Sequence, residues 1–60
     1  MYLKFYAVPC ETSPGKWQVM AERDTLPPRL MDFGLAKPAA LRAMRHMEQA
    51  AMLAGAIVVA

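Results

Sequence analysis

The hydrophobic pattern of this chain changes its period twice within 60 residues. Residues 2–8 and 16–23 alternate between two faces in steps of two, which is typical of half-buried β-strands. Residues 38–53 instead repeat their apolar side chains about every 3.6 residues, which predicts an amphipathic helix. The run 56–60 is continuous and β-branched, and it predicts a strand buried on both faces. A chain that combines these patterns belongs to the α+β class.

Local signals indicate where these elements end. Pro9 ends the first strand, and the turn formers that follow, including Pro14 and Gly15, predict a hairpin loop. Pro38 lies where the first helical turn tolerates proline, and Gly55 follows the helix. One stripe of this helix is apolar and the opposite side is basic, so we expect the stripe to be buried. The stripe consists of Ala40, Met44, Met47, Ala51 and Ala54.

Residues 24–37 follow neither period. Pro27 and Pro28 argue against a regular helix or a central strand there. We therefore predict an ordered connector. The segment is too apolar for a solvated linker, so some of its side chains should contact the end of the core or the surface of a partner. Its large apolar side chains are Leu26, Leu30, Met31, Phe33 and Leu35.

The predicted elements assemble into a single ββαβ domain over residues 1–60. The hairpin reverses the direction of the chain, and the helix then crosses back over the sheet. We therefore predict a three-stranded antiparallel sheet with one helix packed on one face. With the strands numbered along the chain, their order in the sheet is 2-1-3. One helix leaves the other face of such a sheet open, and an apolar patch of that kind marks an interaction surface. The side chains left open are either Tyr2, Tyr6, Val8 and Met20, or Leu3, Phe5, Trp17 and Val19.

A domain of this length buries only about 60% of the surface that its unfolded chain exposes, so its stability is marginal without a further constraint. Cys10 is the only cysteine, which excludes an internal disulfide, and Cys10 with His46 provides too few ligands for structural zinc. Oligomerisation is the remaining means of stabilisation, and the 57% hydrophobic composition supplies apolar surface for it. We therefore expect a homodimer, with a twofold axis that relates the copies either sheet face to sheet face or edge to edge.

The composition also bears on the compartment. A single cysteine suits a reducing environment, and the N-terminal residues lack the apolar stretch of a signal peptide. The most apolar segment, 50–60, covers 11 residues, whereas a membrane-spanning helix needs about 20. We expect a cytoplasmic protein with no membrane segment. The net charge of +2 and the pI of about 9.0 permit contact with nucleic acid but do not indicate it.

Four segments form a recognisable series: Tyr6-Ala7-Val8-Pro9, Gly15-Lys16-Trp17-Gln18-Val19, Lys37-Pro38-Ala39-Ala40 and Gly55-Ala56-Ile57-Val58-Val59. This series resembles a family of short bacterial proteins catalogued as a domain of unknown function, with a DUF2188-like ββαβ pattern. Its members have an aromatic-x-Val-Pro strand, a strand that opens with Trp, a Lys-x-x-Ala helix and a β-branched strand after Gly-Ala. The resemblance implies the ββαβ fold and assigns no activity. The proline-rich segment 24–36 is more elaborate here than in that family.

No catalytic, cofactor or metal site is legible in the sequence. Asp32-Phe33-Gly34 spells the metal-binding triplet of protein kinases, but a kinase needs two lobes and a glycine-rich loop, which 60 residues cannot hold. Gly34 is better explained by a turn with positive φ. Cys10 lacks a base, because the only imidazole, His46, falls on the solvent side of the helix. We therefore predict a protein that is not an enzyme and that uses no cofactor.

We predict instead a small protein-protein binding module, such as a bacterial accessory protein or a phage-type inhibitor. Its partner would be a second copy or a larger protein, held by the open sheet face and the apolar connector. The expected contact residues are Tyr2, Tyr6, Met20, Leu30, Met31 and Phe33. The alternative is a small nucleic-acid-binding protein that uses the basic helix face, which the sparse lysine content disfavours. That face consists of Lys37, Arg42, Arg45 and His46.

Overall fold

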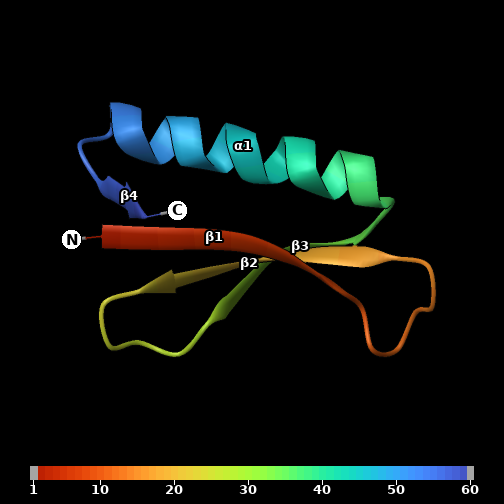
Figure 1. The fold of residues 1–60 in the computed structure, drawn as a ribbon. Helices are drawn as coiled ribbons and strands as arrows, with labels where there is room; N and C mark the ends of the chain where they lie inside the picture. The colour runs from red at the N-terminus through yellow and green to blue at the C-terminus, as the bar shows by residue number, and fades with distance from the viewer. Residues whose placement is uncertain (1, 60) are drawn as a thin grey trace.

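A computed structural model describes residues 2–59 of the chain. The strands form one four-stranded sheet in the order β3-β2-β1-β4, and α1 packs against it (Figure 1). The predicted α+β class is confirmed, but the sheet has one strand more than predicted. The elements in chain order are β1 (Tyr2–Pro9), β2 (Trp17–Arg23), β3 (Arg29–Leu35), α1 (Lys37–Leu53) and β4 (Ile57–Val59).

β1 and β2 form the hairpin that the alternating pattern predicts. They pair antiparallel along nearly their whole length. Two backbone hydrogen bonds close the loop between them: the N–H of Cys10 donates to the carbonyl of Lys16 at 2.9 Å, and the N–H of Lys16 donates to the carbonyl of Ser13 at 3.0 Å. The turn formers of this loop therefore bring the two strands into register, as expected from their sequence.

β3 lies within the segment 24–37, so the prediction that this whole segment is a connector is wrong. β3 pairs antiparallel with β2, but its register shifts at two places. The first shift lies between the pairs Trp17–Leu35 and Val19–Asp32, and Gly34 falls within it with a φ of 73°. Gly34 therefore belongs to a β-bulge rather than to a turn. These irregularities break the alternation by which a strand is recognised. Pro27 and Pro28 precede the strand and interrupt no ladder within it.

β4 runs parallel to β1 and pairs with Tyr2–Lys4, so the predicted antiparallel direction is wrong. The error follows from the missed strand. β3 reverses the chain once more before the helix, so α1 crosses in the opposite sense and returns the chain parallel to β1. The predicted neighbours of β1 are nevertheless correct, because β2 and β4 flank it.

β4 is an edge strand, so the prediction that it is buried on both faces is also wrong. The side chains of Ile57 and Val59 are 68% and 39% exposed, whereas Val58 between them is half-buried. β1 is its only neighbour in the sheet formed by the described residues. A strand with a single neighbour and no cover on one face cannot bury both sets of its side chains.

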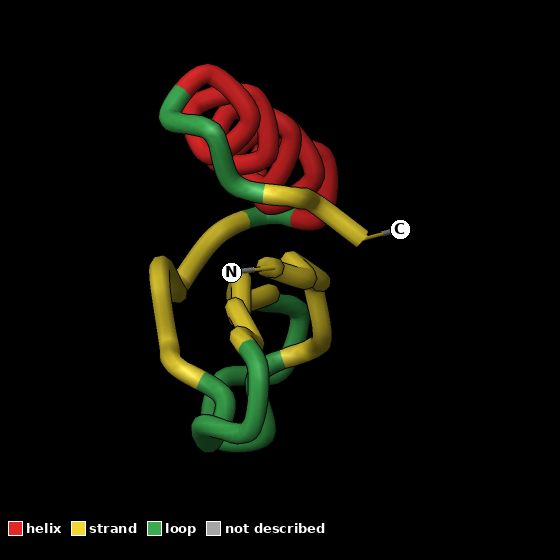
Figure 2. The backbone as a smooth tube through the Cα atoms, turned by 90° about the vertical axis from the view of Figure 1, so that its left-hand side faces the viewer, coloured by secondary structure: helices red, strands yellow, loops and turns green. Residues whose placement is uncertain are grey.

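The helix covers the sheet face that contains Phe5 and Val19. These two residues and Ala40 of α1 are the buried apolar residues of the described chain. At the start of α1, the Nζ atom of Lys37 lies 5.0 Å from the centroid of the Trp17 ring, on the same sheet face. Figures 1 and 2 show α1 along one side of the sheet only. The predicted arrangement of one helix on one face is therefore confirmed.

α1 begins one residue earlier than predicted and has most of the expected apolar stripe. Ala54, the last residue of the predicted stripe, lies beyond the helix and is exposed. No helix among residues 2–59 has the length and apolar character that crossing a membrane requires. The stripe residues turned toward the sheet are Ala40, which is buried, and Met44, Met47 and Ala51, which are half-buried.

The helix ends in a Schellman turn that directs the chain back to the sheet. The N–H of Ala56 donates to the carbonyl of Ala51 at 3.0 Å, and the N–H of Gly55 donates to the carbonyl of Met52 at 3.0 Å. Gly55 has a φ of 89°, which a residue with a Cβ atom adopts only with strain. This turn positions β4 beside the start of β1.

Candidate functional site

The sheet face opposite α1 contains a row of apolar side chains that crosses three strands. Tyr6 of β1 lies opposite Met20 of β2, and Met20 lies opposite Leu30 of β3. Directly opposed residues point to the same face of a sheet, so these three side chains form a continuous strip, here called the open-face row. Tyr6 and Met20 are half-buried, and Leu30 is 48% exposed. The structure thus brings together three of the residues predicted to contact a partner.

Polar side chains flank the open-face row and order it. The Tyr6 hydroxyl donates a hydrogen bond to Oε1 of Glu22 at 3.2 Å, and Nε2 of Gln18 donates to Sδ of Met20 at 3.5 Å. Partial burial, and then the adjacent Glu22 carboxylate, raise the pKa of Tyr6 above its ordinary value of 10.0. Tyr6 is therefore neutral at physiological pH and presents an uncharged ring to the open face.

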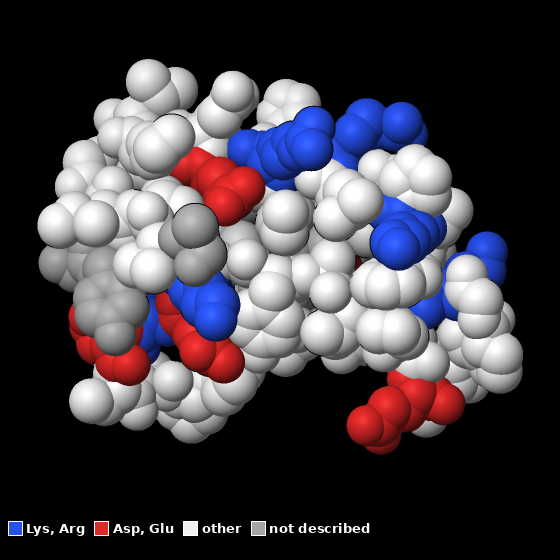
Figure 3. Space-filling view, viewed as in Figure 1, with Lys and Arg blue, Asp and Glu red and all other residues white. Residues whose placement is uncertain are grey.

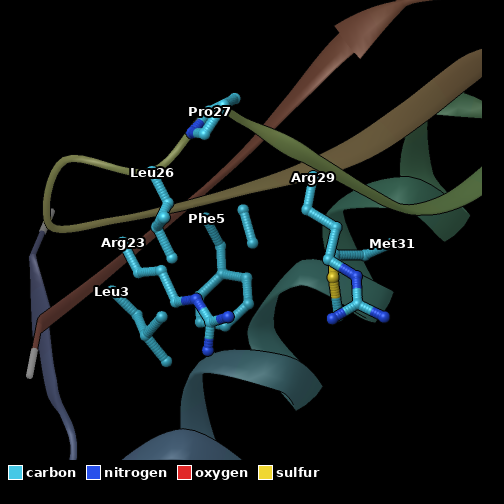
Figure 4. Close-up of a pocket in the computed structure, with 8 residues that line it drawn as sticks. Leu3, Phe5, Arg23, Leu26, Pro27, Arg29 and Met31 are labelled. Atoms are coloured by element: carbon cyan, nitrogen blue, oxygen red, sulfur yellow. The ribbon is translucent and has the colours of Figure 1, made fainter.

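Met31 and Phe33, two further predicted contact residues, lie apart from this row. Met31 lines a cavity on the helix side of the sheet (Figure 4). Phe33 belongs to the irregular part of β3, and its side chain is 68% exposed. The backbone N–H of Phe33 donates to Oδ1 of Asp32 at 2.8 Å, which orders the backbone at the bulge. The side chain of Tyr2 lies outside the described residues.

The molecule exposes more surface than a monomer of its mass usually does. Its accessible surface is 4426 Å², whereas a folded monomer of 6.7 kDa is expected to expose roughly 3,900 Å². Large apolar side chains contribute to the excess in three regions: the β2–β3 turn with β3, the end of α1, and β4. Those exposed among the described residues are Leu26, Leu30, Met31, Phe33, Met52, Leu53, Ile57 and Val59.

A cavity of about 470 Å³ opens at the corner of the sheet where β2 turns into β3. It lies on the same sheet face as α1, but no residue of the helix lines it. Figure 4 shows side chains from β1, β2, the turn and β3 around one common space. No acidic residue belongs to its lining. Its long side chains are the apolar Leu3, Phe5, Leu26 and Met31 and the charged Arg23 and Arg29.

Sequence reasoning missed the two arginines of this cavity. The alternation of β2 places Arg23 on the same face as Val19 and Ala21, so the face on which Arg23 lies could have been predicted from the sequence. The face on which Arg29 lies could not, because Arg29 is the first residue of the unpredicted strand β3. The register of β3 against β2 is what places both arginines at one corner of the sheet.

The basic residues predicted for nucleic acid do not form a single face. Arg42, Arg45 and His46 are exposed on α1, but Lys37 is held over the ring of Trp17. Figure 3 shows basic groups gathered at the upper right, over α1 and beside it, with uncharged surface between them and most acidic groups at the lower edge. Binding along a phosphate backbone depends on clustered positive charge. The exposed part of the predicted basic face is therefore Arg42, Arg45 and His46 on α1.

The candidate sites described above are surfaces and a cavity. Among residues 2–59, no group of three or more His, Cys, Asp or Glu side chains could hold a metal ion. Cys10 is half-buried at the end of β1, and His46 is exposed on α1. The side-chain hydrogen bonds of the described chain do not join these two residues.

Comparisons with protein-family models, with curated proteins and with solved structures find no match for this chain. The resemblance to the domain-of-unknown-function family therefore stays a prediction. The function has to be inferred from the surfaces themselves.

Proposed function

We propose that this protein is a small, non-enzymatic protein-protein binding module that associates with a second copy of itself through the open face of its sheet. The supporting observation is the open-face row of Tyr6, Met20 and Leu30, which α1 cannot cover because it lies on the opposite face. A larger protein target could occupy the same face, as for an accessory protein or a phage-type inhibitor. We place this activity in the cytoplasm.

The apolar character of the open face extends to the edge strand β4. Val59 lies opposite Lys4 in the parallel pairing of β4 with β1, so it shares the open face with Lys4. Among the described residues, the only charged pair directly opposed on this face is Lys4 and Glu22, which have opposite signs. Two copies placed face to face therefore meet without net repulsion, and the apolar strips exclude water from each other.

The mass of the protein in solution tests this proposal. Light scattering over a concentration series should show a mass near twice the 6.7 kDa of one chain. Met20→Glu places a carboxylate at the centre of the open-face row, where a face-to-face dimer would bury it, and should return the protein to one chain. Circular dichroism would verify that the variant remains folded. A mass of one chain at every concentration would contradict self-association.

Leu53→Glu is the matched control for the charge substitution. Leu53 is 90% exposed at the end of α1, remote in the fold from the open-face row, so the same change there should leave the dimer intact. If Leu53→Glu dissociated the protein and Met20→Glu did not, the interface would lie at the helix end. That outcome would refute the open-face assignment.

A salt series separates this function from the nucleic-acid alternative. Binding to phosphates weakens steeply as the salt concentration rises, whereas association through apolar surface does not. Replacing Arg42 and Arg45 with Glu should abolish nucleic-acid binding and leave the mass in solution unchanged. Retention of nucleic acid at low salt, lost in this double variant, would favour the alternative.

A further inference from the structure

Arg23 and Arg29 lie on neighbouring strands and on the same face of the sheet. Arg29 is opposite Ala21, and Arg23 follows Ala21 by two residues on β2. Diagonal neighbours of this kind have Cα atoms about 7–8 Å apart, so two long side chains starting there can reach a common ligand group. Both arginines are exposed, and the side-chain hydrogen bonds of the described chain do not involve them.

Three acidic residues lie near this corner, and the printed lining of the cavity includes none of them. Asp32 lies opposite Val19, on the same sheet face as the two arginines, and its Oδ1 accepts the hydrogen bond from the backbone N–H of Phe33. Glu22 points to the opposite face, where its carboxylate accepts the hydrogen bond from Tyr6. Asp24 belongs to the turn after β2 and does not line the cavity. Both positive side chains line the same cavity, so each would attract an anion bound there. Guanidinium groups bind carboxylates with a matching fork of N–H donors.

The rest of the cavity is apolar. Leu3 and Phe5 of β1, Leu26 of the turn and Met31 of β3 line its walls (Figure 4). Its volume of about 470 Å³ falls within the roughly 300–1,000 Å³ that small-molecule sites occupy. Met31 adds an unbranched side chain that adapts to the shape of an apolar ligand.

We propose that this cavity binds a small amphipathic anion, a carboxylate with an aliphatic body. The two guanidinium groups would hold the carboxylate at the mouth, and the apolar walls would hold the chain. This site lies on the opposite face of the sheet from the open-face row. It therefore adds a ligand to the proposed function and does not depend on the dimer.

Three amphiphiles with the same chain and different heads test the proposal: decanoate, decanol and decyltrimethylammonium. Each is titrated below its micelle-forming concentration into the isotope-labelled protein and followed by the amide signals in NMR spectra. Decanoate should bind saturably and shift the signals of Leu3, Leu26 and Met31, whereas the cation should not bind there. Signals of Met52 and Leu53, a second exposed apolar region at the end of α1, should stay in place.

Arg23→Gln combined with Arg29→Gln should weaken decanoate binding by about tenfold or more, because hydrogen bonds to charged groups are lost. It should also remove the preference for decanoate over decanol. Arg42→Gln with Arg45→Gln makes the same change in charge on the helix and should leave binding unchanged.

Three results would overturn the assignment. The first is binding of the three amphiphiles with equal affinity, which indicates a nonspecific apolar surface. The second is a set of shifted signals at the open face or at the helix end. The third is the absence of decanoate binding to a protein whose spectrum shows that it is folded.

Discussion

Shortening Val19 to alanine tests the assignment of the core, because Val19 is the only large side chain of the described residues with no exposed surface. The substitution removes two methyl groups, worth about 0.8 kcal/mol each in transfer free energy, and leaves a cavity that adds a further cost. The free energy of unfolding should therefore fall by about 2 kcal/mol. A domain of 60 residues has a total of about 3–9 kcal/mol, so this is a large fraction.

Thermal and urea unfolding monitored by circular dichroism would measure this change. For a domain of this size a loss of about 2 kcal/mol lowers Tm by roughly 8–16 °C. Val59→Ala is the matched control, since the same side chain is 39% exposed on the edge strand, and it should cost well under half as much. Equal losses in the two variants would show that Val19 is not the centre of the core.

Five further substitutions, at four positions, test other contacts of the fold. Gly55→Ala should lower the free energy of unfolding by about 1–2 kcal/mol, because a residue with a Cβ atom is strained at a φ of 89°. The Cβ atom would meet nothing within 4 Å, so no steric clash adds to this cost. A urea midpoint that stays or rises would contradict the left-handed turn. Lys37→Met should cost about 0.5–1 kcal/mol through loss of the cation-π contact with Trp17, whereas Lys37→Arg should retain it, and similar losses in both variants would argue against that contact. Since the folded-state pKa of Tyr6 is raised above 10.0, its neutral form stabilises the fold below that pH, and this contribution should be lost as the pH rises through the higher folded-state pKa. Tyr6→Phe should abolish the corresponding fall in stability and Glu22→Gln should reduce it; alkaline unfolding curves identical to that of the parent protein would count against the shift.

The hairpin and the helix could be predicted because their signals are local. The alternation on either side of Pro14 and Gly15 indicates two strands, and the repeat over residues 38–53 indicates a helix. The open-face residues Tyr6 and Met20 could also be grouped, because alternation in a known hairpin assigns each side chain to a face. Which of the two faces the helix covers could not be decided, since both contain large apolar side chains.

The missed strand shows how one nonlocal element changes the topology. β3 contains a bulge at Gly34 and follows two prolines, so its own residues resemble a loop, and only pairing with β2 makes it a strand. Its absence from the prediction reversed the direction of β4 and concealed the cavity that Arg23 and Arg29 share.

Sequence periodicity by itself determined the α+β class, the first hairpin, the helix and the sets of side chains that share a strand face, because these depend on the geometry of neighbouring residues. Tertiary structure alone decided that β3 exists, that β4 runs parallel to β1, and that Phe5 and Val19 rather than Tyr6 and Met20 lie under the helix. The reason is that strand pairing and face selection depend on hydrogen bonds and packing between residues far apart in the chain, which no local pattern specifies.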